Sequence, residues 1–62
     1  MWLKLTKDTG ELTVINMDNV TDFSRAPGDK FTKIRTITPK GEGIHIIEVQ
    51  EEPDRIIEIS TL

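Results

Sequence analysis

The fold is decided by residues 3–15, which read LKLTKDTGELTVI. Residues 3–6 and 11–15 each alternate apolar with polar side chains, as a strand with one buried face requires. Between them, Lys7-Asp8-Thr9-Gly10 has the composition of a tight turn. We therefore predict that these residues form an antiparallel β-hairpin.

The large apolar residues do not all fit on one face of such a hairpin. If Leu3 and Leu5 face the core, Trp2 has the opposite parity and faces outward. The same problem arises at Ile15, Ile37 and Ile44 or Ile46. Exposed apolar patches of this kind usually mark contacts. Trp2 is therefore either folded over the end of a barrel or an anchor at an oligomer or partner interface.

Beyond the hairpin, turn-forming residues divide the chain into segments of strand length. Residues 16–19, Asn-Met-Asp-Asn, hold three side chains that can bond their own backbone, so the chain should turn there. Val20 and Phe23 are three residues apart, which predicts one helical turn leading into a short strand, because residues three apart on a strand face opposite sides. Ala26-Pro27-Gly28-Asp29 predicts the next turn.

Two further strands follow along the chain. Residues 31–38 have the pattern of a strand, and residues 39–43, PKGEG, predict the turn of a second hairpin. Residues 44–49 form the next strand and are apolar on both faces apart from His45 and Glu48. We expect such a strand to be central in its sheet or to lie at a subunit contact.

The C-terminal residues 51–59 carry two conflicting signals. Acidic residues around a first turn, with Pro53 near the first helical position, predict a helix in which Ile56 and Ile59 share a face. Three isoleucines in four residues favour a sixth strand instead. We expect a short helix, with the strand as the alternative.

The composition favours β-structure throughout. Ile, Thr and Val supply 20 of the 62 residues and Ala supplies one, so β-branched side chains dominate over helix formers. We predict one mainly β domain over residues 1–62, a five-stranded antiparallel meander curled into an open barrel or half-sandwich. A chain this small, without cysteine, has neither disulfides nor a thiolate metal site to stabilise it. We therefore expect it to complete its core by self-association as a homo-oligomer.

Several short motifs resemble a known family. The order Leu3-Lys4-Leu5-Thr6, Gly10-Glu11, Val14-Ile15-Asn16 and then residues 49–54, VQEEPD, is similar to that of small bacterial β-rich proteins typified by the FlbD and SwrD flagellar-associated family. In that family a Leu-Thr strand, Gly-Glu, an Asn-ended second strand and a Val-x-Glu segment precede a Pro-started terminal helix. The resemblance implies a similar architecture and an accessory, motility-related role, and it assigns no catalytic residue.

The charge of the chain bears on its possible partners. A net charge of −3 argues against a nucleic-acid binder that relies on general electrostatic attraction. Residues 25–40 nevertheless hold five basic residues against one acid, and Lys33 and Arg35 share a face of the predicted strand. These two could meet phosphates while Phe31 stacks on a base, so a nucleic-acid or ribonucleoprotein accessory is the alternative. No apolar run approaches the roughly 20 residues that cross a bilayer, so we expect a cytoplasmic protein without a membrane partner.

The chemistry-bearing residues do not predict an enzyme. His45 is the only histidine and cysteine is absent, so we expect neither a metal site nor a cofactor. Ser24 and Ser60 lack a sequence context that marks a nucleophile. We therefore predict a non-enzymatic interaction module that docks a protein partner or another copy of itself. Its candidate interaction residues are Trp2, Lys33 and Arg35.

Overall fold

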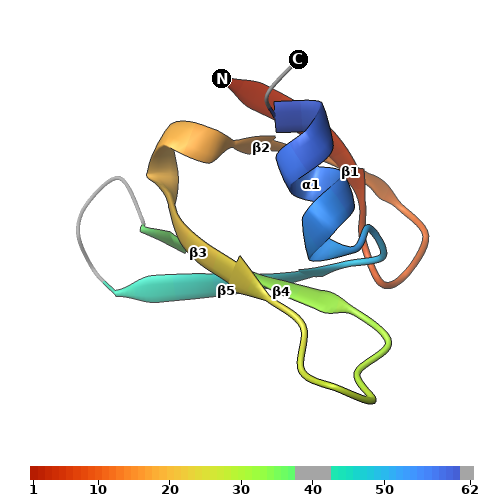
Figure 1. Ribbon diagram of the computed structural model, residues 1–62. Helices are drawn as coiled ribbons and strands as arrows, with labels where there is room; N and C mark the ends of the chain where they lie inside the picture. Colours follow the sequence, from red (N-terminus) through yellow and green to blue (C-terminus); the bar gives the residue numbers. More distant parts are fainter. Residues whose placement is uncertain (38–42, 61–62) are drawn as a thin grey trace.

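The computed structural model describes residues 1–37 and 43–60. These residues form five strands, a short 3₁₀ helix and a C-terminal α-helix (Figure 1). In chain order the elements are β1 (Trp2–Thr6), β2 (Leu12–Asn16), η1 (Met17–Asn19), β3 (Val20–Ser24), β4 (Thr32–Ile37), β5 (Ile44–Val49) and α1 (Pro53–Ser60). A mainly β chain with a short terminal helix is confirmed, and the alternative of a sixth strand is wrong.

β1 and β2 form the predicted hairpin, closed by a tight turn. The Lys7 N–H donates to the Glu11 carbonyl at 2.7 Å, and the Gly10 N–H donates to the Lys7 carbonyl at 2.9 Å. Gly10 has a φ of 95°, which a residue with a Cβ adopts only at an energetic cost. The turn therefore needs glycine at this position.

The register of the hairpin places Ile15 in the core. Ile15 lies directly opposite Leu3 and is buried, whereas Leu12 and Val14 are exposed. The expectation that Ile15 faces away from the leucines is therefore wrong. The turn sets which residues of β2 share a face with Leu3 and Leu5, and it overrides the apolar alternation within β2.

The chain turns at η1, as predicted for residues 16–19. The Asn16 side chain accepts the Asp18 N–H at 3.1 Å and caps this short helix. One helical turn leading into a short strand is confirmed, as η1 followed by β3, but Val20 and Phe23 lie in the strand and not in the helical turn. A bulge between Val20 and Asp22 shifts the alternation of β3, so Val20 and Phe23 both pack against the core.

The strands form two antiparallel sheets rather than the predicted single meander. β1 pairs with β2, and β3, β4 and β5 form the second sheet. η1 turns the chain between β2 and β3, and these consecutive strands do not pair. The sheets meet instead where Lys7 bridges Val49 and the Gln50 N–H donates to the Thr6 carbonyl at 2.8 Å. Within residues 1–37 and 43–60 they do not close into a barrel.

β5 is an edge strand of its sheet and not a central one. It pairs with β4 along its whole length, and its other edge meets Lys7 at the end near Val49. The prediction of a central position is therefore wrong, and the alternative of a subunit contact stays a prediction. The turn predicted at residues 39–43 lies, apart from Gly43, outside the described residues.

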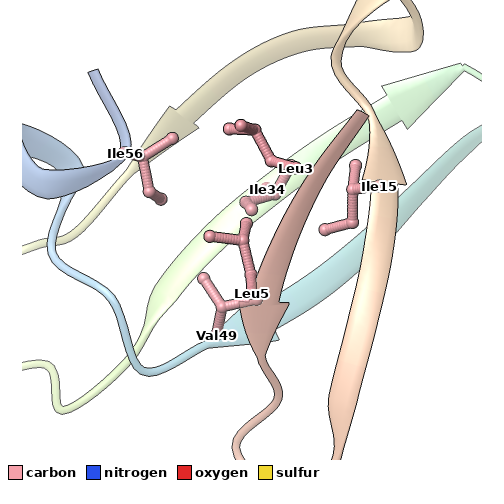
Figure 2. Packing of buried hydrophobic residues seen from close by; sticks show 6 residues of the cluster. All are labelled: Leu3, Leu5, Ile15, Ile34, Val49 and Ile56. Carbon is pink, nitrogen blue, oxygen red and sulfur yellow. The ribbon is translucent and has the colours of Figure 1, made fainter. Parts of the chain in front are cut away.

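The buried core draws on both sheets and on α1 (Figure 2). Its members are Leu3, Leu5, Ile15, Ile34, Val49 and Ile56. α1 contributes Ile56, which is fully buried, and Ile59 packs against the same cluster, as the helix pattern predicts. Figure 2 shows Ile56 at one end of the cluster and Ile15 at the other. α1 therefore covers the core from the side remote from Ile15.

A polar network fastens the segment before α1 to the strands. Thr32 is fully buried, and its hydroxyl donates to the Glu51 carbonyl at 2.6 Å and accepts from Nε of Arg25 at 3.2 Å. The Arg25 guanidinium also donates to the Gln50 carbonyl at 2.9 Å. The Glu51 carboxylate accepts the Thr6 N–H, with both oxygens 3.0 Å from the nitrogen. These bonds tie β1 and β4 to the start of α1.

Candidate interaction surface

More large apolar side chains are exposed than are buried in the core of the described residues. The exposed ones are Met1, Trp2, Leu12, Val14, Ile37, Ile44, Ile46 and Ile57. Scattered exposed apolar residues are normal on a protein, whereas a contiguous group indicates a contact site. The arrangement of these residues therefore matters more than their number.

One group lies on the outer face of β4 and β5. Ile37 and Ile44 are direct cross-strand partners, and Ile46 follows two residues later on the same face. The inner face of the same strands carries Ile34 and Val49 into the core. Both faces of this edge of the sheet are therefore apolar. The β1-β2 hairpin and α1 cover the inner face and leave the outer face exposed.

A second group surrounds an open depression. Trp2 is 66% exposed and faces outward, as its parity predicts. It lines a depression of about 300 Å³ together with the exposed side chains of Val14 and Ile37. Ile15 and Ile47 line the same depression from the core side. The depression thus opens the apolar core to solvent beside Trp2.

The two groups share Ile37, which lines the depression and pairs with Ile44 across the strands. We call the set Trp2, Val14, Ile37, Ile44 and Ile46 the Ile37 surface. The polar residues that line its depression, Asn16, Asn19, Thr36 and His45, come from β2, η1, β4 and β5. Asn16, Asn19 and Thr36 are uncharged side chains.

A second, more polar depression of about 350 Å³ lies along β5. It is lined by Lys7, Asp8, Thr13, His45, Ile46, Ile47 and Glu48. His45 and Ile47 belong to both depressions, so the two are neighbours along the same strand. The side of the molecule between β2 and the edge of β5 is therefore open over the length of both depressions.

The candidate basic residues lie on the outer face of β4, apart from Trp2. Arg35 is exposed, and its Nε is 3.9 Å from a carboxylate oxygen of Asp22 on β3. Lys33 is exposed and lies opposite Glu48 in the register of β4 and β5. Each base therefore has an acid beside it, and the phosphate-attracting charge of this face is largely compensated.

Of the remaining basic residues of the central segment, Arg25 does not extend this patch. Arg25 turns inward and bonds Thr32 and Gln50, and its guanidinium lies 3.9 Å from a carboxylate oxygen of Glu52. Lys40 lies outside the described residues. The structure therefore brings Lys33 and Arg35 together, but it places neither of them in the depression lined by Trp2.

Three observations on the described residues concern metal ions, the serine of α1 and membranes. They contain no group of three or more His, Asp or Glu side chains arranged to hold a metal ion. The Ser60 hydroxyl donates to the Ile57 carbonyl within α1 at 3.0 Å. No helix in the described ranges has both the length and the apolar character needed to span a membrane.

Sequence reasoning did not select Val14, Ile44 or Ile46 as candidate interaction residues. The apolar character of residues 44–49 on both faces was the available signal for the two isoleucines. Val14 had no such signal, because alternation within β2 makes it appear to be a core residue. Its exposure follows from the register that the turn imposes.

Comparison with known protein families, with curated proteins and with solved structures finds no match to this chain.

Proposed function

We propose that this chain is a non-enzymatic, cytoplasmic interaction module that docks protein partners and forms a homo-oligomer. The observation that carries the proposal is the Ile37 surface, five exposed apolar residues linked through Ile37, on a chain with only six buried apolar residues among those described. Exposed apolar residues that gather in this way are typical of protein contact sites. Trp2, at one end of the surface, belongs to the residue type most enriched among energetic hot spots.

The energetics of a small domain support the same proposal. Fully burying an aliphatic side chain contributes about 1.5–3 kcal/mol, so each half-exposed member of the Ile37 surface forgoes about 1 kcal/mol. A domain of this size has a net stability of only a few kcal/mol from its own core. A protein partner that covers the surface therefore supplies burial comparable to the whole stability of the isolated chain.

The proposal includes an accessory, motility-related role through the family resemblance. β1 ends at Thr6, β2 ends at Asn16 and α1 begins at Pro53, so the element boundaries fall at the motifs on which the resemblance rests. A strain that lacks the chain should show altered motility without loss of growth. Normal motility of such a strain would remove this part of the proposal and leave the interaction module in place.

Sedimentation equilibrium of the full chain tests the proposal of self-association. Near about 10 µM, we expect an average mass above that of the monomer, because the apolar surface is buried between copies. The circular dichroism spectrum should show at the same time that the chain is folded. A folded and strictly monomeric species would contradict the homo-oligomer.

Retention on heparin or on a labelled oligonucleotide tests the alternative of a nucleic-acid accessory. The acids beside Lys33 and Arg35 lead us to expect no retention at low salt. Salt-dependent retention that is lost in Lys33→Gln and Arg35→Gln would favour the alternative. Exchange of the exposed Lys4 for Gln is a matched control, because it removes the same charge from a different sheet.

A further inference from the structure

We propose that the partner covering the Ile37 surface is a second copy of this chain, related to the first by a two-fold axis. In this dimer the Trp2 side chain of each subunit packs into the depression of the other. The inference rests on the proposed function and adds to it the identity of the partner and the residues of the contact. Four properties of the described residues support it.

The first property is the total accessible surface of the chain. The isolated subunit exposes 4464 Å². A compact monomer of 7.1 kDa exposes about 4,100 Å² by the usual scaling of surface with mass. The chain therefore exposes about 400 Å² more than this scaling gives, which is compatible with an uncovered contact face.

The second property is the area that the surface offers to a dimer. Complete burial removes about 60–120 Å² for an aliphatic side chain and 150–250 Å² for an aromatic one. Scaled by the exposed fractions of its five members, the Ile37 surface offers roughly 230–430 Å² per subunit. Homodimer interfaces are about 65% non-polar, so two copies would bury about 700–1,300 Å² in total. That range includes the roughly 1,000 Å² expected of a specific interface.

The third property is self-complementarity. A two-fold contact uses the same patch on both subunits, so the patch must carry both a protrusion and a recess that receives it. Trp2 is the most exposed member of the Ile37 surface, and it lies directly beside the depression of about 300 Å³. Figure 2 shows Ile56 of α1 at the end of the core cluster remote from Ile15. No described residue of α1 lines the recess.

The fourth property is the distribution of charge. Each copy carries a net charge of −3, so the copies can approach only where acids are absent or compensated. The members of the Ile37 surface are uncharged, and their cross-strand neighbours Lys4, opposite Val14, and Arg35, opposite Ile46, are basic. Arg35 is itself paired with Asp22. Glu48 lies on the same face as Ile46 and has Lys33 opposite it. Two copies of this surface therefore meet without uncompensated acids, and added salt should not dissociate the dimer.

Sedimentation equilibrium and the fluorescence of the single tryptophan together test the dimer. The full chain is measured from about 1 to 300 µM, a range chosen because interfaces near the lower size limit bind weakly. We expect the mass to rise from monomer to dimer, with the emission of Trp2 shifting to shorter wavelength over the same concentrations. The dimer should persist when the sodium chloride concentration is raised from about 0.05 to 0.5 M.

Matched variants separate this inference from the proposed function. Ile37→Thr should weaken dimerisation by at least about tenfold, because a two-fold contact counts each substitution twice. Ile57→Thr, at an equally exposed position on α1, should leave dimerisation unchanged. Val14→Thr serves as a second interface variant if the circular dichroism of Ile37→Thr shows a loss of fold.

The other possible results would refute either the two-fold contact or self-association as a whole. Association that is unaffected by Ile37→Thr or Val14→Thr, a mass that grows beyond the dimer, or a mass increase without a shift in Trp2 emission would refute the two-fold contact and leave self-association intact. Dissociation by salt would refute it as well. A folded wild-type monomer at all concentrations would refute both the dimer and the proposed homo-oligomer.

Discussion

Replacing the buried Thr32 by valine should destabilise the chain through the loss of one hydroxyl group. The hydroxyl donates to the Glu51 carbonyl at 2.6 Å and accepts from Nε of Arg25 at 3.2 Å. A neutral hydrogen bond contributes about 0.5–1.5 kcal/mol net, and one to a charged group about 1.5–3 kcal/mol. The Glu51 carbonyl would keep only the long contact to Nη2 of Arg25 at 3.5 Å. We therefore expect Thr32→Val to cost about 2–3 kcal/mol of unfolding free energy.

Urea unfolding followed by circular dichroism measures this cost. At one fixed protein concentration, the midpoint should fall while the slope with urea stays constant. The corresponding decrease in melting temperature is roughly 10–20 °C for a domain of this size. Thr21→Val is the matched control, because the Thr21 hydroxyl is exposed on β3 and its loss should cost no more than about 0.5 kcal/mol. Equal midpoints for the two variants would refute the assignment of the buried network as a stabilising element.

Three further predictions concern other parts of the fold. Ile56→Ala should lower the unfolding free energy by about 2–5 kcal/mol, because it removes the fully buried side chain of α1. Hydrogen exchange should then show that the amides of α1 are unprotected. Continued protection of these amides would contradict the role of Ile56. Gly28→Ala should lower the unfolding free energy by about 1–2 kcal/mol, because the φ of residue 28 is 91°. Backbone strain is the whole of this cost, because an added Cβ meets no atom within 4 Å. An unchanged urea midpoint would argue against a strained turn. Arg35→Ala should change the melting temperature by less than about 4 °C, because its ion pair with Asp22 is exposed; a larger fall would show that this pair contributes more than surface pairs usually do.

Local sequence was sufficient to predict most strands and turns. Glycine at position 10 and the Asx residues around η1 act over a few residues, so their effect on the chain is visible without knowledge of distant contacts. The same holds for α1, where Pro53 and the spacing of Ile56 and Ile59 predict both the start and the buried face. The outward position of Trp2 followed from its parity relative to Leu3.

The candidate site was only partly predictable, because local signals act over a few residues and do not show which distant residues become neighbours. Trp2 lines the depression of the Ile37 surface. Lys33 and Arg35 share the outer face of β4 with Ile37 and lie beside acids that are distant in sequence. The compensation of Arg35 by Asp22 depends on the pairing of β3 with β4. No local pattern in residues 25–40 predicts this compensation.

What the sequence by itself determined is the set of elements: β-branched residues and turn formers specify five strands and a terminal helix, because backbone preferences act over short distances. Only the tertiary structure decided which faces are buried. The closed turn at Lys7 and Glu11 put Ile15 in the core and left Val14 in solvent, and η1 separated β2 from β3 so that two sheets formed. The two faces of β2 have similar apolar character. Which of them is buried depends on the hydrogen-bond register with β1 and on the sheet that packs against the hairpin.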